Sequence, residues 1–189
     1  MSTKGEQTRR LILAAAEKLF ARQGYQAVTM TDVCEACGLS RGGLYRHFGS
    51  TKALFIAILE ADMRQGQSAV QRSLSTGVPA MVILNHYFAG EKAAMFGERN
   101  GLFFAIHEFA FCEADMREFF AERLCRAVEV IGNILEHGQK NGEFKALDVE
   151  AVANHILYCM DSMKTSSILF ESTERMVEAQ FELIREMLV

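Results

Sequence analysis

The sequence contains very little proline: Pro79 is the single proline among 189 residues, and tryptophan is absent. Half of the residues are hydrophobic, yet no apolar run approaches the ~20 residues that a membrane span needs. Proline is the residue that most strongly breaks helices, so this composition favours a mostly helical protein with a substantial core and no membrane partner. No segment alternates strictly enough to predict a strand. The expected fold class is all-α.

Signals for export and for disulfides are also missing. The start, MSTKGEQTRR, lacks the apolar segment of a secretory signal, so we expect a cytoplasmic protein. Five cysteines are an odd number, which favours reduced thiols. Cys34 and Cys37 form one C-x-x-C pair, but a tetrahedral metal site needs about four ligands. We expect buried thiols without metal or cofactor, and a redox or metal sensor is the alternative.

Catalytic signatures are absent as well. The sequence has no Gly-x-Ser-x-Gly motif, no phosphate-binding glycine loop and no cluster of carboxylates. We therefore do not expect an enzyme. A small all-α enzyme or ligand-binding protein without DNA binding remains the alternative class.

Charge is distributed unevenly along the chain, although the net charge is only -4. Residues 1–52 contain eight basic and four acidic residues, a net charge of +4, whereas residues 53–189 contain 12 basic and 20 acidic residues, a net charge of -8. A basic segment attached to an acidic remainder is typical of a protein that approaches phosphates with one end.

Helical spacing of apolar residues recurs through the chain. It predicts a first helix over residues 8–22 that ends before Gly24. Longer helices follow residue 50, with joints expected at 75–77, 97–101, 141–143 and 172–173. The chain therefore resolves into a small N-terminal unit and a larger C-terminal bundle.

Residues 29–48 have the pattern of a helix-turn-helix. Thr29 and Asp32 form a capping-box pair before a short helix over 30–37, and Ser40 is expected to cap a second helix over 41–48. The second helix of this motif enters the major groove of DNA. A simple loop is the alternative interpretation of this stretch.

The side chains of the second helix suit DNA. Arg41 and Arg46 match phosphates or guanine edges, while Tyr45 and His47 offer backbone contacts. Gly42 and Gly43 cost about 1 kcal/mol each relative to alanine inside a helix. That cost is explained if the backbone must approach DNA without a β-carbon in the way.

From Thr8 to Leu59, and above all over GLSRGGLYRHFGSTKALF (residues 38–55), the chain resembles the tetracycline-repressor (TetR) family of bacterial transcriptional regulators. The shared features are a turn glycine, a Ser-capped recognition helix, an aromatic-His-Phe ending and a lysine at the start of the fourth helix. Gly43 departs from the family, which more often has Thr or Ala there, so base preference at that position is open. The DNA-binding residues implied are Thr29, Ser40, Arg41, Gly42, Gly43, Tyr45, Arg46, His47 and Lys52, the last as a phosphate contact.

The resemblance implies two domains, a helix-turn-helix domain over residues 1–52 and an effector-binding and dimerisation domain over 53–189. It also implies a homodimer built mainly by the last two long helices. The expected interface residues are Val152, Ile156, Met160, Met163, Val177, Phe181 and Ile184.

An effector pocket is expected inside the larger domain. Phe103, His107 and Phe111 share one helical face, which is either core or the apolar lining of a ligand site with one polar group. The expected pocket residues are Met63, Phe88, Phe96, Phe103, His107, Phe111, Phe120 and Tyr158.

These features together predict a homodimeric repressor. It is expected to bind a pseudo-palindromic double-stranded DNA operator and to release it when a small apolar or aromatic effector binds. Regulation by a protein partner, or by oxidation of the cysteines, is the alternative for the effector part.

Overall fold

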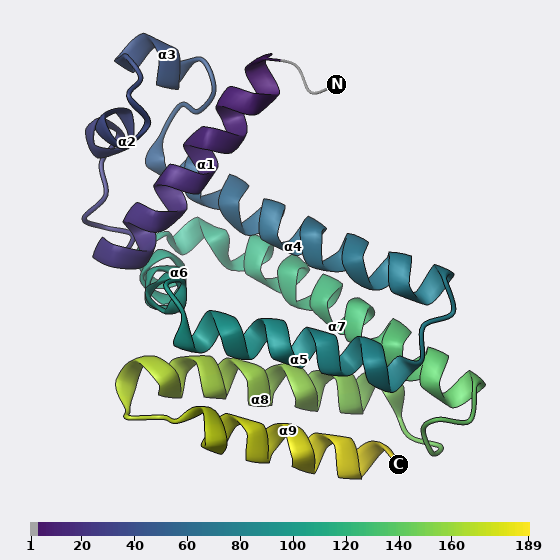
Figure 1. The fold of residues 1–189 in the computed structure, drawn as a ribbon. Helices are drawn as coiled ribbons and strands as arrows, with labels where there is room; N and C mark the ends of the chain where they lie inside the picture. Colours follow the sequence, from purple (N-terminus) through teal and green to yellow (C-terminus); the bar gives the residue numbers. More distant parts are fainter. Residues whose placement is uncertain (1–3) are drawn as a thin grey trace. The chain divides into compact units, whose positions relative to one another are not determined.

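The computed structural model describes residues 4–189, so residues 1–3 of the expected first domain lie outside the described residues. The described residues are helical and contain no strand, which confirms the all-α prediction (Figure 1). The helices are α1 (Lys4–Gln23), α2 (Met30–Cys37), α3 (Arg41–Tyr45), α4 (Thr51–Ser75), α5 (Ala80–Phe96), α6 (Asn100–Cys112), the 3-10 turn η1 (Ala114–Met116), α7 (Arg117–Lys140), α8 (Val149–Leu169) and α9 (Glu174–Leu188).

The chain divides into two compact units. The first runs to Asp62 and also takes in Glu98–Ala114, while the second comprises Met63–Gly97 and Asp115–Val189. The expected boundary at residue 52 differs from this division. The start of α4 belongs to the first unit because Phe55 packs edge-on against Phe20 of α1, with ring centroids 4.8 Å apart. Helix α6 belongs there because it packs along α1.

An aromatic cluster forms the centre of the first unit. Phe20, Tyr25, Phe55 and Phe109 pack at centroid distances between 4.8 and 6.0 Å. All four side chains are buried, and Phe109 comes from α6, far along the sequence. This cluster joins α1, α4 and α6 into one core, against which α2 and α3 are placed.

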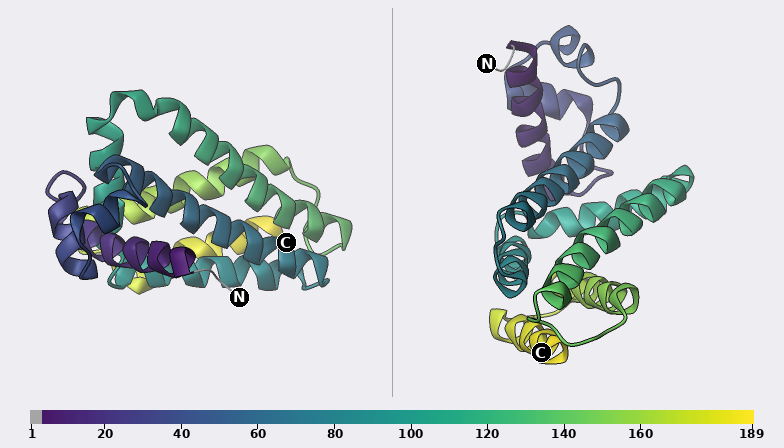
Figure 2. Two further views of the ribbon diagram at one scale, coloured as in Figure 1. Left: turned by 90° about the horizontal axis from the view of Figure 1, so that it is seen from above. Right: turned by 90° about the vertical axis from the view of Figure 1, so that its right-hand side faces the viewer.

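The second unit is a bundle of α5, α7, α8 and α9 together with the end of α4. Phe88 of α5 stacks on Phe181 of α9 with centroids 4.4 Å apart. Helices α8 and α9 contact each other and run side by side (Figure 1 and the right view of Figure 2). The bundle therefore leaves the two C-terminal helices as neighbours with a shared outer surface.

The turn between α7 and α8 supports the start of α5. Gly142 has a φ of 73°, which places Glu143 so that its carboxylate accepts hydrogen bonds from the backbone N–H groups of Ala80 at 2.9 Å and Met81 at 3.2 Å. Pro79 precedes α5 without any side-chain cap of its own. A residue distant in sequence thus satisfies the first N–H groups of this helix.

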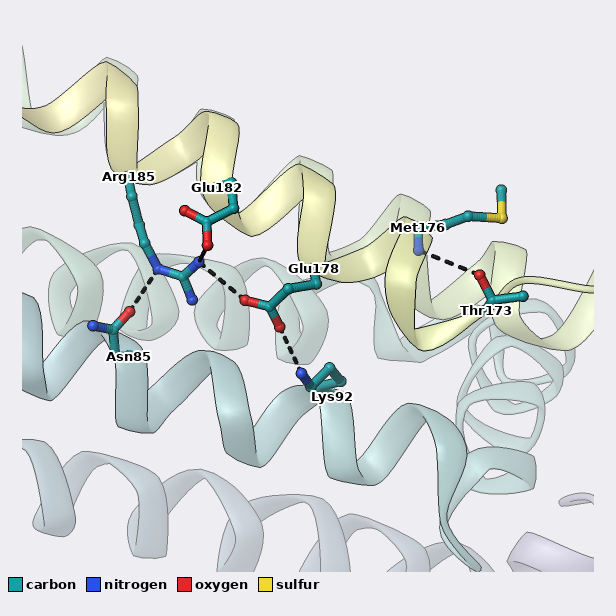
Figure 3. A network of polar contacts seen from close by, with 7 residues as sticks. All are labelled: Asn85, Lys92, Thr173, Met176, Glu178, Glu182 and Arg185. Atoms are coloured by element: carbon teal, nitrogen blue, oxygen red, sulfur yellow. Dashed lines mark hydrogen bonds and ion pairs between the residues drawn. The ribbon is translucent and has the colours of Figure 1, made fainter.

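A polar network joins α9 to α5 (Figure 3). Arg185 donates to Asn85 Oδ1 at 2.7 Å and to Glu178 Oε1 at 3.0 Å, and Glu178 also pairs with Lys92. The hydrogen bond from Lys92 is the largest of the influences that lower the pKa of Glu178 below its ordinary value, and the contact with Arg185 acts in the same direction. The network therefore favours an ionised Glu178.

Candidate nucleic-acid interface

Helix α2 begins with the expected capping box. The Thr29 hydroxyl accepts from the Asp32 backbone N–H at 3.3 Å, and the Asp32 carboxylate accepts from the Thr29 backbone N–H at 2.7 Å. The Thr29 hydroxyl also donates to Asp32, and these bonds lower the pKa of Asp32. The helix ends at Gly38, whose φ of 63° is the left-handed conformation that favours glycine. Thr29 therefore has a structural role as well as its predicted contact with DNA.

Helix α3 is shorter than predicted, because regular helix ends at Tyr45 instead of residue 48. Ser40 caps it as expected, since its hydroxyl accepts from the Gly43 N–H at 3.2 Å. Beyond Tyr45, His47 and Phe48 still donate backbone hydrogen bonds to the Leu44 carbonyl, so the chain continues as a turn. Leu44 is fully buried and fixes the side of α3 that faces the core.

The remaining face of α3 is exposed. Arg41 and Arg46 are exposed, and Tyr45 has 52% of its surface accessible, a large value for an aromatic side chain. Arg41 is also anchored, because its guanidinium donates to the Thr31 hydroxyl of α2 at 3.1 Å. The sequence did not indicate Thr31 as a partner of Arg41. The face thus presents cations and an aromatic ring from a fixed helix.

The glycines of α3 have no steric reason inside the chain. A β-carbon at Gly42 would meet nothing within 4 Å, and one at Gly43 would make only ordinary contacts, the nearest being Ser40 Oγ at 3.4 Å. Neither residue has a positive φ. The fold of the described chain would therefore accept alanine at both positions.

Lys52 lies in the first turn of α4, after the Ser50 cap. Its ammonium group is 3.0 Å from Glu113 Oε2, at the end of α6. The sequence predicted a phosphate contact for Lys52 but gave no sign of Glu113, which is 61 residues away along the chain.

Two family models match the chain. Residues 12–58 match the model for bacterial regulatory proteins of the tetR family, and residues 83–178, half of the chain, match a tetracycline-repressor-like C-terminal domain. The chain belongs to the TetR family. Its members are regulatory proteins, so this chain is a DNA-binding transcriptional regulator and the enzyme alternative is set aside.

Individual relatives agree with this membership. The chain is 26% identical to the HTH-type transcriptional regulator YfiR of Bacillus subtilis (strain 168), over 85% of this chain and 80% of the relative. It is 26% identical to the HTH-type transcriptional repressor KstR2 of Rhodococcus jostii (strain RHA1), over 78% and 74% of the two chains. The solved structure of the regulator FadR of Bacillus subtilis in complex with stearoyl-CoA has the same fold, with a TM-score of 0.72, 17% identity and coverage of 95% and 99%.

The expected effector-pocket residues of this TetR-family chain are distributed over both units. Phe103, His107 and Phe111 belong to the first unit, and the remaining five belong to the second. Three of these residues are either fully buried or widely exposed in the single chain. Phe88 is fully buried and stacks on Phe181 in the core of the second unit. Phe111 and Tyr158 are 86% and 62% exposed, so neither is enclosed in the described chain.

The expected dimer residues lie mostly inside the single chain. Six of the seven are buried inside the single chain, because their apolar stripes face the bundle's own core: Ile156, Met160, Met163, Val177, Phe181 and Ile184. Val152 is half-buried. The exposed apolar side chains of α8, α9 and their connection are different ones: Tyr158, Leu169, Phe170, Met176 and Leu183.

The cysteines are unpaired thiols, of which Cys34 is buried and Cys37 half-buried. Burial, and secondarily the neighbouring Cys34, raises the pKa of the Cys37 thiol. Within residues 4–189, no three His, Cys, Asp or Glu residues gather in a way that suits a metal ion. None of the helices over this range combines the length and the apolar character that crossing a membrane requires.

Proposed function

We propose that the protein is a homodimeric repressor that binds a pseudo-palindromic operator through α3 and releases it when an apolar effector binds. Two recognition helices in one dimer would contact half-sites about 34–36 Å apart, or a multiple of that distance. The exposed face of α3 and the basic charge of residues 1–52 support binding to phosphates and base edges. Because it would act on DNA, we propose that the protein works in the cytoplasm.

The glycines of α3 carry this proposal. Two adjacent glycines in an exposed helix lower its stability, and nothing inside the chain requires them. A close approach by an outside partner is the remaining reason to omit both β-carbons. The exposed Arg41, Tyr45 and Arg46 beside them suit a DNA backbone and groove.

The proposed dimer uses the outer face of α8 and α9. Tyr158, Ser162 and Ser166 recur at four-residue steps on α8, and Met176 and Gln180 do so on α9. These side chains line one groove of about 430 Å³ between the two helices. Exposed apolar groups along such a groove support pairing with the same face of a second copy.

Repression and an apolar effector have separate support. The relative KstR2 is a repressor, and the same fold in FadR holds stearoyl-CoA, so the architecture accommodates an acyl chain. An effector that prefers one dimer geometry by about 1–3 kcal/mol would change operator affinity by five- to 150-fold. A protein partner in place of a small effector is the second candidate. The melting temperature of the protein, measured first with stearoyl-CoA and then with other apolar compounds, separates the two. A protein partner is favoured if none of these compounds raises the melting temperature.

Gel retardation with the DNA that flanks the gene, at low salt, tests the proposal. Wild-type protein should retard this DNA. Gly42→Ala should bind at least about tenfold more weakly while its melting temperature stays equal or rises, since alanine favours helix. Gly90→Ala, in α5 with open space around it, is the matched control and should bind like wild type. Wild-type protein that leaves the DNA unretarded would refute the proposal.

A further inference from the structure

Three side chains of the first unit meet at the end of α6. Glu113 Oε2 lies 3.0 Å from the Lys52 ammonium, and Glu113 Oε1 accepts a hydrogen bond of 2.7 Å from the Tyr25 hydroxyl. The Lys52 and Glu113 side chains are 29% and 27% exposed, so their pair is shielded from water more than an ordinary surface pair. The carboxylate of Glu113 is therefore held beside Lys52 from two sides.

This arrangement affects how Lys52 attracts an anion. Lys52 stands in the first turn of α4, six residues after the exposed Arg46. A phosphate that approaches the Lys52 ammonium group also approaches the Glu113 carboxylate. The phosphate and the carboxylate would then be closer than the screening length of ~8–10 Å at ordinary salt, so they would repel each other. The carboxylate thus offsets the attraction that Lys52 would otherwise contribute.

The position of Glu113 in the chain connects this contact to the rest of the protein. Glu113 is the C-cap of α6, and two residues later, at Asp115, the chain enters the second unit. The other end of the same segment is fixed independently, because Arg99 pairs with Glu17 of α1 at 2.6 Å and with Asp62 of α4 at 2.8 Å. Glu113 is therefore held by Lys52 and Tyr25 at one end of this segment, and Arg99 is held by other partners at the opposite end.

We propose that Glu113 is a positioning residue that holds Lys52 back from the operator phosphate and so lowers the affinity of the protein for DNA. This inference rests on the proposed function, since it assumes that the protein binds DNA near α4. It adds a specific exchange of partners: Lys52 pairs with Glu113 in the free protein and with phosphate in the complex with DNA.

The test is fluorescence anisotropy on the DNA fragment that wild-type protein retards, measured over a series of salt concentrations. Glu113→Gln should bind about two- to fivefold more tightly, the range expected for a partly exposed ion pair. Its plot of log affinity against log salt should steepen by up to ~0.9, the contribution of one further phosphate contact. In a Lys52→Ala background the same Glu113→Gln change should have no effect on affinity.

Glu108→Gln is the matched control. Glu108 lies on α6 and accepts from the Tyr25 backbone N–H, so this variant removes one negative charge from α6 and leaves the Lys52–Glu113 pair in place. It should not tighten binding. Equal tightening by both variants, unchanged affinity in Glu113→Gln, or tightening that persists without Lys52 would each overturn the inference. Wild-type protein that binds no DNA would instead refute the proposed function, and with it the inference.

Discussion

Gly101 of α6 lies directly against the carbonyl oxygen of Ala21 in α1. A β-carbon at Gly101 would stand 1.9 Å from that oxygen, far inside any allowed contact. The obstructing atom belongs to the backbone of another helix, so no side-chain rotation can relieve the clash. This close crossing is what allows α6 to join the core of the first unit.

Gly101→Ala should therefore destabilise the protein. We expect a loss of about 1–3 kcal/mol or more, because α6 must move away from α1 and loosen the aromatic cluster around Phe109. Urea unfolding followed by circular dichroism measures this loss. Gly66→Ala, in the exposed part of α4 where a β-carbon meets nothing, should be neutral or stabilising, and a Gly101 variant that behaves the same way would contradict the crossing.

The outer face of α8 and α9 predicts how the dimer can be separated. Leu183→Glu combined with Met176→Lys should give a folded monomer, because it places charges among side chains that are 58% and 57% exposed in the single chain. Sedimentation analysis measures the mass. Val82→Glu, at a 53% exposed position of α5, should leave the dimer intact. A double variant that remains a dimer would show that another face forms the interface.

The thiols of α2 predict insensitivity to oxidants. The reactive form of cysteine is the thiolate, and burial raises the pKa of Cys37 at the C-terminal end of α2, where the helix dipole also disfavours negative charge. Mass spectrometry should show that Cys37 is alkylated more slowly than the exposed Cys112 and Cys125. Mild peroxide could instead abolish DNA binding by the wild type and leave binding by a Cys34→Ser, Cys37→Ser double variant intact. That result would restore the redox alternative.

The network around Glu178 predicts an acid-dependent contribution to stability. The pKa of Glu178 is lower in the folded protein than in the unfolded chain, where it is about 4.3. The stabilisation that ionised Glu178 contributes to the folded protein is therefore fully present when the pH is above the unfolded pKa. It is lost as the pH falls through the lower pKa of the folded protein. Because the side chain is 37% exposed and solvent screens it, we expect Glu178→Gln to cost less than about 1 kcal/mol at pH 7.

The measurement for Glu178 is urea unfolding at pH 7 and at pH 3. The difference between wild type and Glu178→Gln should shrink at the lower pH. Glu136→Gln removes an exposed i,i+4 partner of Lys140 and should change stability by no more than about 0.5 kcal/mol at pH 7. A Glu178 difference that is larger at pH 3 than at pH 7 would contradict the assigned sign.

Local signals in the sequence were sufficient for most helix boundaries. The Thr29–Asp32 capping box, the Ser40 cap and the four expected joints all correspond to helix ends in the structure, because caps and left-handed glycines act over three or four residues. The break at Glu113, between α6 and α7, was not predicted. It contains neither glycine nor proline, so the sequence has no local marker there.

The sequence by itself determined the fold class and the position of the helix-turn-helix, since both depend on local spacing, capping and charge along a short segment. It also located apolar stripes on α8 and α9. Such a stripe predicts that one face of a helix is buried, but it does not identify the element that covers this face. The tertiary structure decided that these stripes face the bundle's own core, and that Tyr158, Met176 and Leu183 remain outside. It alone brought Glu113 to Lys52, because that contact depends on α6 folding back onto α1, a packing event between segments far apart in the chain.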